Sequence, residues 1–390
     1  MSNSPRSSII PLEDYSFPDA PTINRAEAWY ELVRQKFLQA RSKRTVTDDH
    51  LSRTDLDTVK ELIAEPECRP LMSLLNDKCK NPDESFLELL IIPPCDSAGI
   101  IESWAQESGH QVLEPPSRDV LSSQLAPELP QLDGHGLLVI PRLEYWFIRH
   151  HRGLRHVSSL LKMIRQCDRP VLVSCNSWCW RYLAHVVDTD LVLPEPIAFE
   201  AFNARRLRDW LNELSSSDGT DKVRFLDVND GHDIMAGDDV SVRFEELADL
   251  SLGIPWVAWQ LWRRSLRTAD EREAEEAVDS EESGKPKATE KKQTNSDIKT
   301  LWVTNNPSPL IPLGHEPESL RLLHALLIHD SLSVEELADV LPNIGESQIT
   351  SALIRAGFIE VFDDQLRVRA SAYPAVRSGL SAAGIPTGAI

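Results

Sequence analysis

Residues 86–104, FLELLIIPPCDSAGIIESW, decide how the rest of the sequence is interpreted. The apolar run 87–92, interrupted only by Glu88, is typical of a strand that is buried on both faces. Two prolines end this run at positions 93 and 94, and a helix can begin at Gly99. The stretch therefore predicts a buried strand, a tight glycine-containing turn and a helix.

The same stretch has the spacing of a phosphate-binding loop, G-x-x-x-x-G-K-[ST]. In that motif backbone amides surround the phosphates, the lysine reaches the outer phosphates and the hydroxyl binds Mg²⁺. Pro94 stands at the first glycine and Gly99 at the second, while Ile100 replaces the lysine and Ile101 the hydroxyl. The spacing fits a degenerate nucleotide site, and it fits a plain strand–turn–helix equally well.

Composition limits the class of protein. A chain of 390 residues with 41% hydrophobic and 26% charged residues can form two or three globular domains. The net charge of −20 disfavours broad binding to nucleic acid or anionic lipid. No signal peptide and no transmembrane segment are predicted, so we expect a cytoplasmic protein. Six scattered cysteines predict neither disulfides nor a metal site.

The pattern of apolar and polar residues changes along the chain. Strands at 87–92, 136–140 and 170–175 alternate with helical stretches, which predicts an α/β fold with a parallel sheet covered on both faces. We predict the following order: a disordered N-terminus (1–24), a helical brace (25–80), an α/β domain (81–220), a helical lid (221–268), a disordered charged linker (269–300) and a winged-helix domain (301–384).

The last of these domains has the clearest local signals. Helical patterns cover 318–329, 334–340 and 346–356, and Ser333 with Glu336 forms a capping-box pattern. Two alternating strands follow, and a short turn joins them. Three helices and a hairpin predict a winged helix.

The order of these parts resembles the STAND branch of the AAA+-like P-loop ATPases, over about residues 80–375. Residues 86–104 are similar to the P-loop strand and helix, 137–144 to the Walker B strand, and 171–176 to a sensor strand with Asn176 at its tip. The segment 253–255, Gly-Ile-Pro, is similar to the GxP signature of the lid. The resemblance implies a P-loop NTPase-like domain, a helical lid and a winged helix, with Pro255 near the adenine position.

The departures from that family concern catalysis. Pro141-Arg142 follows the strand where the family has an acidic residue that holds Mg²⁺, and Glu144 comes two residues later. Without that acid and the lysine, little can stabilise a transferring phosphoryl group. The resemblance therefore implies a pseudo-ATPase that uses no cofactor, or alternatively binds ATP or ADP without hydrolysis. The remnant of its nucleotide site comprises Pro94, Gly99, Ile100, Ile101, Glu144, Asn176 and Pro255.

Two other groups of residues, one basic and one of tryptophans, are candidates for binding a ligand or a partner. A basic run after the second strand is interpreted as an anion or partner site at the carboxyl edge of the sheet, or else as a solvated loop; its members are Arg149, His150, His151, Arg152, Arg155 and His156. Trp256, Trp259 and Trp262 recur at helical spacing. They are interpreted as core of the lid, or else as a helix lying on a membrane or a membrane-bound partner.

Three functions follow from these features. The first is an inactive STAND-like P-loop ATPase homologue that acts as a regulatory or scaffolding subunit through protein contacts, including contacts within a membrane-associated complex. The second is a winged-helix transcriptional regulator. Residues 316–384 carry five arginines and no lysine against ten acidic residues, which makes nucleic acid an unfavourable partner. The third is a nucleotide sensor without hydrolysis.

Overall fold

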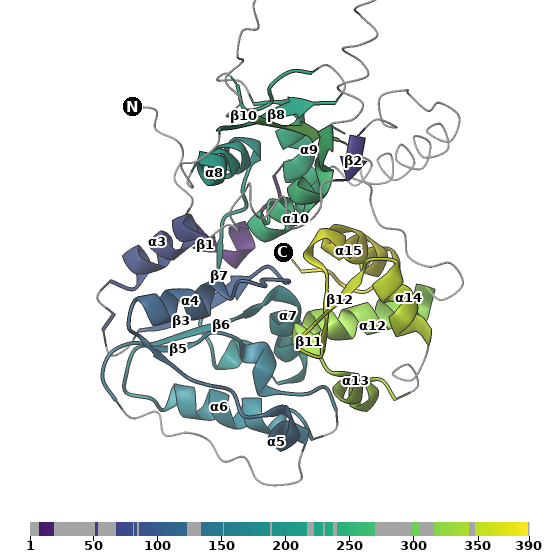
Figure 1. The fold of residues 1–390 in the computed structure, drawn as a ribbon. Coiled ribbons are helices and arrows are strands. Elements are labelled where there is room, and N and C mark those ends of the chain that lie inside the picture. Colours follow the sequence, from purple (N-terminus) through teal and green to yellow (C-terminus); the bar gives the residue numbers. More distant parts are fainter. Residues whose placement is uncertain are drawn as a thin grey trace, which may run out of the picture.

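The computed structural model describes residues 8–18, 51–53, 68–80, 82–83, 86–122, 134–150, 152–187, 189–216, 222–228, 231–236, 240–269, 298–304, 316–342, 348–388 and 390. In this part of the chain, three sheets and their helices form an α/β unit, a smaller sheet-and-helix unit above it and a C-terminal module beside both (Figure 1).

The central sheet is mostly parallel, as the alternation of strands and helices predicts. Its spatial order is β1-β7-β3-β6-β5-β4, and only the β1–β7 pair is antiparallel. The strands are β1 (Ile9–Pro11), β3 (Leu87–Ile92), β4 (Gln111–Val112), β5 (Leu138–Ile140), β6 (Val171–Asn176) and β7 (Ile197–Phe199). Strand β6 is buried along its whole length, in keeping with its apolar start at Val171–Val173 and its lack of charged residues.

Helices cover both faces of this sheet, with α4 and α6 on opposite sides (Figure 1). The helical elements here are η1 (Leu12–Asp14), α3 (Arg69–Lys78), α4 (Ile100–Glu107), α5 (Arg118–Ser122), η2 (Leu143–Trp146), α6 (Arg155–Arg165), α7 (Ser177–Val186) and η3 (Thr189–Leu191). The strand and helix predicted within 86–104 are confirmed as β3 and α4.

Two edge strands depart from the sequence prediction. Strand β7 is present where no strand is predicted. The expectation of a disordered N-terminus is wrong for residues 8–18, because β1 pairs with β7 and closes that edge of the sheet. The pairing supplies backbone hydrogen bonds that a local reading of a Ser/Pro-rich segment cannot anticipate.

The lid region is more than a set of helices. Its helices are α9 (Val242–Ser251) and α10 (Pro255–Ser265), and α8 (Ala204–Ser216) packs with them although the sequence assigns it to the α/β domain. A sheet of order β2-β9-β10-β8 completes the unit. These strands are β2 (Leu51–Arg53), β8 (Lys222–Asp227), β9 (Leu266–Ala269) and β10 (Ile298–Val303). The residues predicted to open the winged-helix domain at 301 therefore pair with β8 and β9 instead.

The tryptophan stripe of α10 lies in the core of this unit. Trp256, Trp259 and Trp262 are 6%, 3% and 2% exposed. Trp262 stacks on Phe244 and contacts Phe225. The membrane-surface interpretation of these residues is therefore wrong. None of the helices in the described ranges combines the length and apolar character needed to traverse a bilayer.

The C-terminal module, residues 316–390, contains the predicted three helices and hairpin. Its elements are α12 (Glu316–His329), β11 (Ser331–Leu332), α13 (Val334–Val340), α14 (Gln348–Arg355), β12 (Ile359–Phe362), β13 (Gln365–Val368), η4 (Ala370–Ala372) and α15 (Tyr373–Ala382). Its sheet has the order β11-β13-β12. The capping box of Ser333 and Glu336 is confirmed by bonds of 3.1 and 2.7 Å.

Several predictions fall on residues outside the described ranges. They are the brace helices expected within 25–63, residues 270–297 of the predicted linker and the histidine at position 151. The predictions are wrong where strands occupy these segments: β2 at 51–53 within the brace, and the ends of the linker at Ala269 in β9 and at 298–300 in β10.

Gly253, in the Gly-Ile-Pro segment that connects α9 to α10, has a φ of +70°. A Cβ there would lie 2.8 Å from Ala201 Cβ, 2.8 Å from Pro18 Cγ and 2.9 Å from Phe202 O. Gly357 also has positive φ, +80°, but a Cβ there meets nothing within 4 Å.

We therefore expect Gly357→Ala to lower the free energy of unfolding by about 1–2 kcal/mol, from backbone strain alone. Gly253→Ala should cost about 1–3 kcal/mol more, because overpacking adds to the strain. Urea denaturation of both variants checks this difference. Equal losses would contradict the close approach at Gly253.

Candidate functional site

The carboxyl ends of β3, β5 and β6 meet at one edge of the central sheet, where parallel α/β sheets place their ligands. The loop 93–99 follows β3, η2 follows β5, and Asn176 ends β6. The structure therefore brings together most of the predicted nucleotide-site remnant. The chemistry of this edge depends on which groups occupy the loop.

The carboxylate of Asp96 occupies the backbone amides of the loop. Oδ1 accepts from Ala98 N and Gly99 N, both at 3.2 Å, and Oδ2 accepts from Ile100 N at 2.8 Å. Gly99 adopts the left-handed conformation, φ +61° and ψ +59°, which turns the chain into α4. These amides are the unpaired donors of a helix N-terminus, the groups that bind phosphate in phosphate loops. Here a side chain of the protein binds them.

The two isoleucines of the loop lie in the hydrophobic core. Ile100 is 1% exposed and Ile101 is fully buried. They contribute to the packing of α4 on the sheet, so the positions at which a phosphate loop has its lysine and hydroxyl face inward. The loop therefore offers neither a lysine nor a hydroxyl at these positions to bind a phosphate.

Arg142, which follows β5 where the sequence resemblance leads one to expect an acidic residue, lies against the loop. Its Nη2 donates to the backbone oxygen of Asp96 at 2.8 Å, and its Nε donates to Glu102 on α4. Nη1 donates to Asp330 Oδ2 at 2.8 Å. The residue is only 9% exposed. Burial raises the pKa of Asp96, and the Arg142 guanidinium opposes that shift.

Asp330 comes from the C-terminal module and closes the site from outside. Besides Arg142, it accepts a 2.9 Å hydrogen bond from Tyr145 Oη. The guanidiniums of Arg142 and Arg118 lie 5.5 and 5.1 Å from the centre of the Tyr145 ring. One carboxylate of the module is therefore tied to η2 by two bonds.

Arg118 on α5 makes a second link to the module. It donates to Phe147 O at 3.0 Å and to the backbone oxygens of His329 and Ser331, both at 3.5 Å. Its Nε lies 3.9 Å from Glu336 Oε1. The interface also contains aromatic contacts of Phe147 with His329. The module is thus docked on the edge that would receive a ligand.

Glu144 and Asn176 lie next to each other, and their side chains make hydrogen bonds within the interior of the protein. Glu144 is fully buried, and its Oε2 accepts from Asn176 N at 3.3 Å. Its Oε1 has no partner among the described residues. Burial raises the pKa of Glu144 to about 8, against the opposing effect of Arg142. The side chain of Asn176 caps α7 by accepting from Trp178 N at 3.0 Å and Cys179 N at 2.8 Å.

The lid segment also contacts the loop. Pro255 is the first residue of α10, where a missing N–H costs nothing. The next residue, Trp256, donates from Nε1 to Pro94 O at 2.8 Å. The structure therefore brings Pro94 and the lid signature together through a tryptophan.

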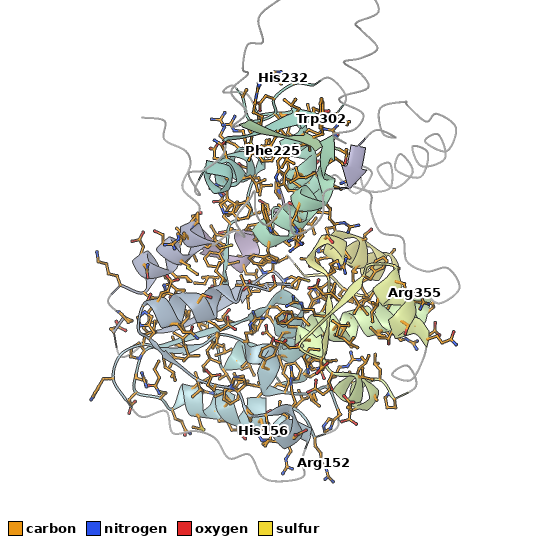
Figure 2. The ribbon with its side chains drawn as sticks, viewed as in Figure 1. Arg152, His156, Phe225, His232, Trp302 and Arg355 are labelled. Atoms are coloured by element: carbon orange, nitrogen blue, oxygen red, sulfur yellow. The ribbon has the colours of Figure 1, made fainter. Side chains whose placement is uncertain are left out.

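The basic run does not form one site. Arg149 is partly buried and its backbone N donates to His329 Nε2 at 3.3 Å, whereas Arg152 and Arg155 are exposed. His150 Nδ1 accepts from Arg152 N at 3.2 Å. Figure 2 shows Arg152 at the outer edge of the molecule and His156 near α6.

His156 is 2% exposed, so it cannot line an open surface with its neighbours. His151 lies outside the described residues. Among the described residues, no group of His, Cys, Asp and Glu has the arrangement of a metal site.

Sequence reasoning missed Asp96, Glu102, Arg118 and Asp330. A signal existed for Asp96, because an aspartate just before a helix is a preferred capping residue. Asp330 follows a helix 188 residues after Arg142, and nothing in the local sequence links the two.

No protein-family model matches this chain, and no curated protein matches it. Among solved structures, the chain is similar to a mutant of RuvB from Thermotoga maritima, with 12% identity, a TM-score of 0.29, and coverage of 83% of this chain and 95% of that one. It is also similar to the ORC2 protein of Aeropyrum pernix in ADPNP-ADP complexes, with 12% identity, a TM-score of 0.33, and coverage of 83% and 96%.

A third similar structure is Cdc6p from Pyrobaculum aerophilum, with 11% identity, a TM-score of 0.28, and coverage of 83% and 97%. At these values the three structures do not decide the chemistry of this chain. The side chains at the carboxyl edge of the central sheet determine what this site can do chemically.

If Asp96 acts as an internal anion, removing it should create a vacancy for an external one. We expect Asp96→Ala to lower the melting temperature and to make it rise with inorganic phosphate more steeply than in the wild type. Asp96→Asn keeps one acceptor oxygen and should respond less. Identical phosphate responses of all three proteins would contradict the role of Asp96.

The Asp330 contacts should contribute measurably to stability. Asp330→Asn keeps the shape, and asparagine tolerates the φ of +62° at this position. We expect a loss of about 1–3 kcal/mol, because Arg142 and Tyr145 lose a charged acceptor. A double-mutant cycle with Tyr145→Phe should show coupling above about 0.5 kcal/mol. Asp339→Asn, on the exposed side of α13, is the matched control.

The docked module should also weaken in acid. Burial, reinforced by Arg149, lowers the pKa of His324 to about 4. The unfolded chain titrates near pH 6.5, so it binds the extra proton first as the pH falls. The stability that neutral His324 confers is thus complete above about pH 6.5 and is lost toward pH 4.

Urea denaturation between pH 7 and 4 measures this loss. We expect His324→Phe to have a shallower decline than the wild type. Arg149→Gln should also flatten it, because removing the neighbouring charge lets the pKa of His324 rise. A wild-type slope in both variants would contradict the assignment.

Proposed function

We propose that this protein is a catalytically inactive homologue of the STAND-like AAA+ P-loop ATPases and acts as a regulatory or scaffolding subunit through protein–protein contacts. In this proposal the α/β unit is a degenerate nucleotide domain, the α8–α10 unit is its lid, and the C-terminal module is a winged helix.

The strand order supports the proposed ancestry. Numbered along the chain from β3 to β7, the parallel strands lie in the order 5-1-4-3-2, which is the order of AAA+-like P-loop ATPases. The loop after β3 therefore lies beside the tip of β6, as the resemblance to a P-loop and a sensor strand implies. The succession α12-β11-α13-α14-β12-β13, with β11 pairing to β13, fits a winged helix.

The observation that carries the proposed loss of activity is the occupied loop. The amides that would bind phosphate are bound by the Asp96 carboxylate, and the Arg142 guanidinium is bonded to three acceptor groups above them. A nucleotide would have to displace Asp96 and meet its negative charge. ATP or ADP binding without hydrolysis is therefore disfavoured as well.

The remaining acidic residue of the site is unsuited to catalysis. Glu144 is fully buried and its Oε2 accepts from Asn176 N at 3.3 Å, so it has no contact with solvent water from which it could take a proton. Arg142 repels a metal cation where the family holds Mg²⁺. Phosphoryl transfer without a lysine or a metal would lack the electrostatic stabilisation that normally drives it.

A scaffolding role follows from how the module is fixed. Asp330 and Glu336 tie it to the closed edge of the sheet, so its opposite side is presented to partners in a constant orientation. Arg355 lies on that outer side, away from the central sheet (Figure 2). With ten acidic residues against five arginines, this module favours protein over DNA as a partner.

Thermal denaturation with and without nucleotide tests the proposal. We expect no rise in melting temperature with millimolar ATP or ADP and Mg²⁺, and no release of phosphate from ATP. An active P-loop ATPase serves as the positive control. A nucleotide-dependent rise that Gly99→Ala or Glu144→Gln abolishes would overturn the proposal.

A further inference from the structure

The outer strand of the C-terminal module has an unusual surface. Seven large hydrophobic side chains are exposed among the described residues: Val120, Val186, Leu191, Val242, Val334, Val361 and Phe362. Only Val361 and Phe362 are adjacent, at 55% and 56% exposure, and Phe362 is the aromatic one of the seven. Both belong to β12. Exposed aromatic residues such as Phe362 are enriched at surfaces that contact protein partners.

Strand β12 also has a free backbone edge in the described part of the chain. It pairs with β13 on one side, and the order β11-β13-β12 places it at the border of the sheet. Natural edge strands are usually protected by charges, proline or covering elements. Here the apolar residues come at the edge, with their side chains on opposite faces of the strand.

The register fixes which backbone groups point outward. Phe362 and Gln365 flank the two-residue turn Asp363-Asp364 and pair with each other. Residues flanking such a turn exchange hydrogen bonds, and the pattern alternates along the ladder. The N–H and C=O of Val361 therefore point away from β13, toward any added strand.

The charges around this edge select a cationic partner. Glu360 is already neutralised by Arg367 Nε at 2.7 Å, and the same guanidinium lies 4.7 Å from the Phe362 ring centre. Asp363 and Asp364 have positive φ, +46° and +60°, and are exposed. No described residue forms an ion pair with either of them. The tip of the hairpin thus presents two uncompensated carboxylates beside an apolar edge.

We propose that β12 is a docking strand for an extended segment of a partner protein, in which lysine or arginine alternates with apolar residues, and that this segment adds to the sheet beside β12. The inference rests on the proposed scaffolding function and names its partner class. Main-chain bonds would supply affinity, and the Asp363-Asp364 turn would supply charge selectivity. A second copy of the chain is disfavoured by the net charge of −20, which makes two copies repel each other.

The test begins with random peptides of about twelve residues, displayed in a library and selected against the full chain. The expected binders alternate cationic and apolar residues, and on binding they protect the Val361 amide from hydrogen exchange. Binders that are acidic or have helical spacing, or that leave Val361 unprotected, would overturn the inference.

Three variants then measure the affinity of a selected peptide. Val361→Pro removes the outward N–H but no ladder bond, as proline does on edge strands, and should weaken binding at least tenfold. Val334→Pro is the matched control, because this equally exposed valine is the first residue of α13, where proline is tolerated. It should leave binding unchanged.

The third variant, Asp363→Asn with Asp364→Asn, keeps the turn, since asparagine suits positive φ. It should weaken binding several-fold and remove most of its salt dependence, even if Val361→Pro fails to fold. Unchanged binding would contradict the charge selectivity. None of these measurements involves nucleotide, so the failure of the two proposals can be told apart. Nucleotide binding would overturn the proposed function, whereas the peptide results alone decide whether β12 is a docking strand.

Discussion

The buried guanidinium of Arg142 is the group on which the arrangement of the molecule depends. A charge with 9% exposure is costly unless every donor is satisfied, and here the acceptors come from three elements. Asp96 belongs to the loop after β3, Glu102 to α4 and Asp330 to the end of α12. Since removing any one acceptor leaves part of a buried charge unpaired, the loop, its helix and the C-terminal module constrain one another.

The loop between β3 and α4 supplies a hydrogen-bond acceptor for the unpaired amides at the N-terminus of α4, so no ligand is needed there. A phosphate loop leaves its amides open and relies on phosphate to satisfy them, whereas this loop supplies its own carboxylate from Asp96. An internal anion is always present at high effective concentration, so an external one competes poorly. The N-terminus of α4 is thus satisfied from within the chain and acts as a structural connection between the loop and the helix.

The same edge contains groups that the interior holds in their neutral forms. Burial raises the pKa of Glu144 and lowers the pKa of His329 well below its ordinary range. Both changes have the same largest cause, the cost of charging a group away from water, and the nearby Arg118 and Arg149 lower the pKa of His329 further. The module covers this edge with His329 and with the aromatic contacts of Phe147 and Trp178. The interface between the module and this edge is therefore largely apolar, and it surrounds the single cluster of charges in which Arg142 is paired.

Local patterns in the sequence determined many of the helices and buried strands and their order along the chain, but not the edge strands β1 and β7. The run 87–92 has the length and apolar character of a buried strand, and Ser333 with Glu336 specifies a helix start, so β3 and α13 could be predicted from neighbouring residues. The isoleucines at 100 and 101, where a phosphate loop has a lysine and a hydroxyl, could also be recognised from the sequence. Only the tertiary structure decided that β1 pairs with β7, that β10 joins β8, and that Asp330 meets Arg142. Those contacts join residues far apart in the chain, where burial and charge pairing are set by the packing of whole units and leave no local pattern.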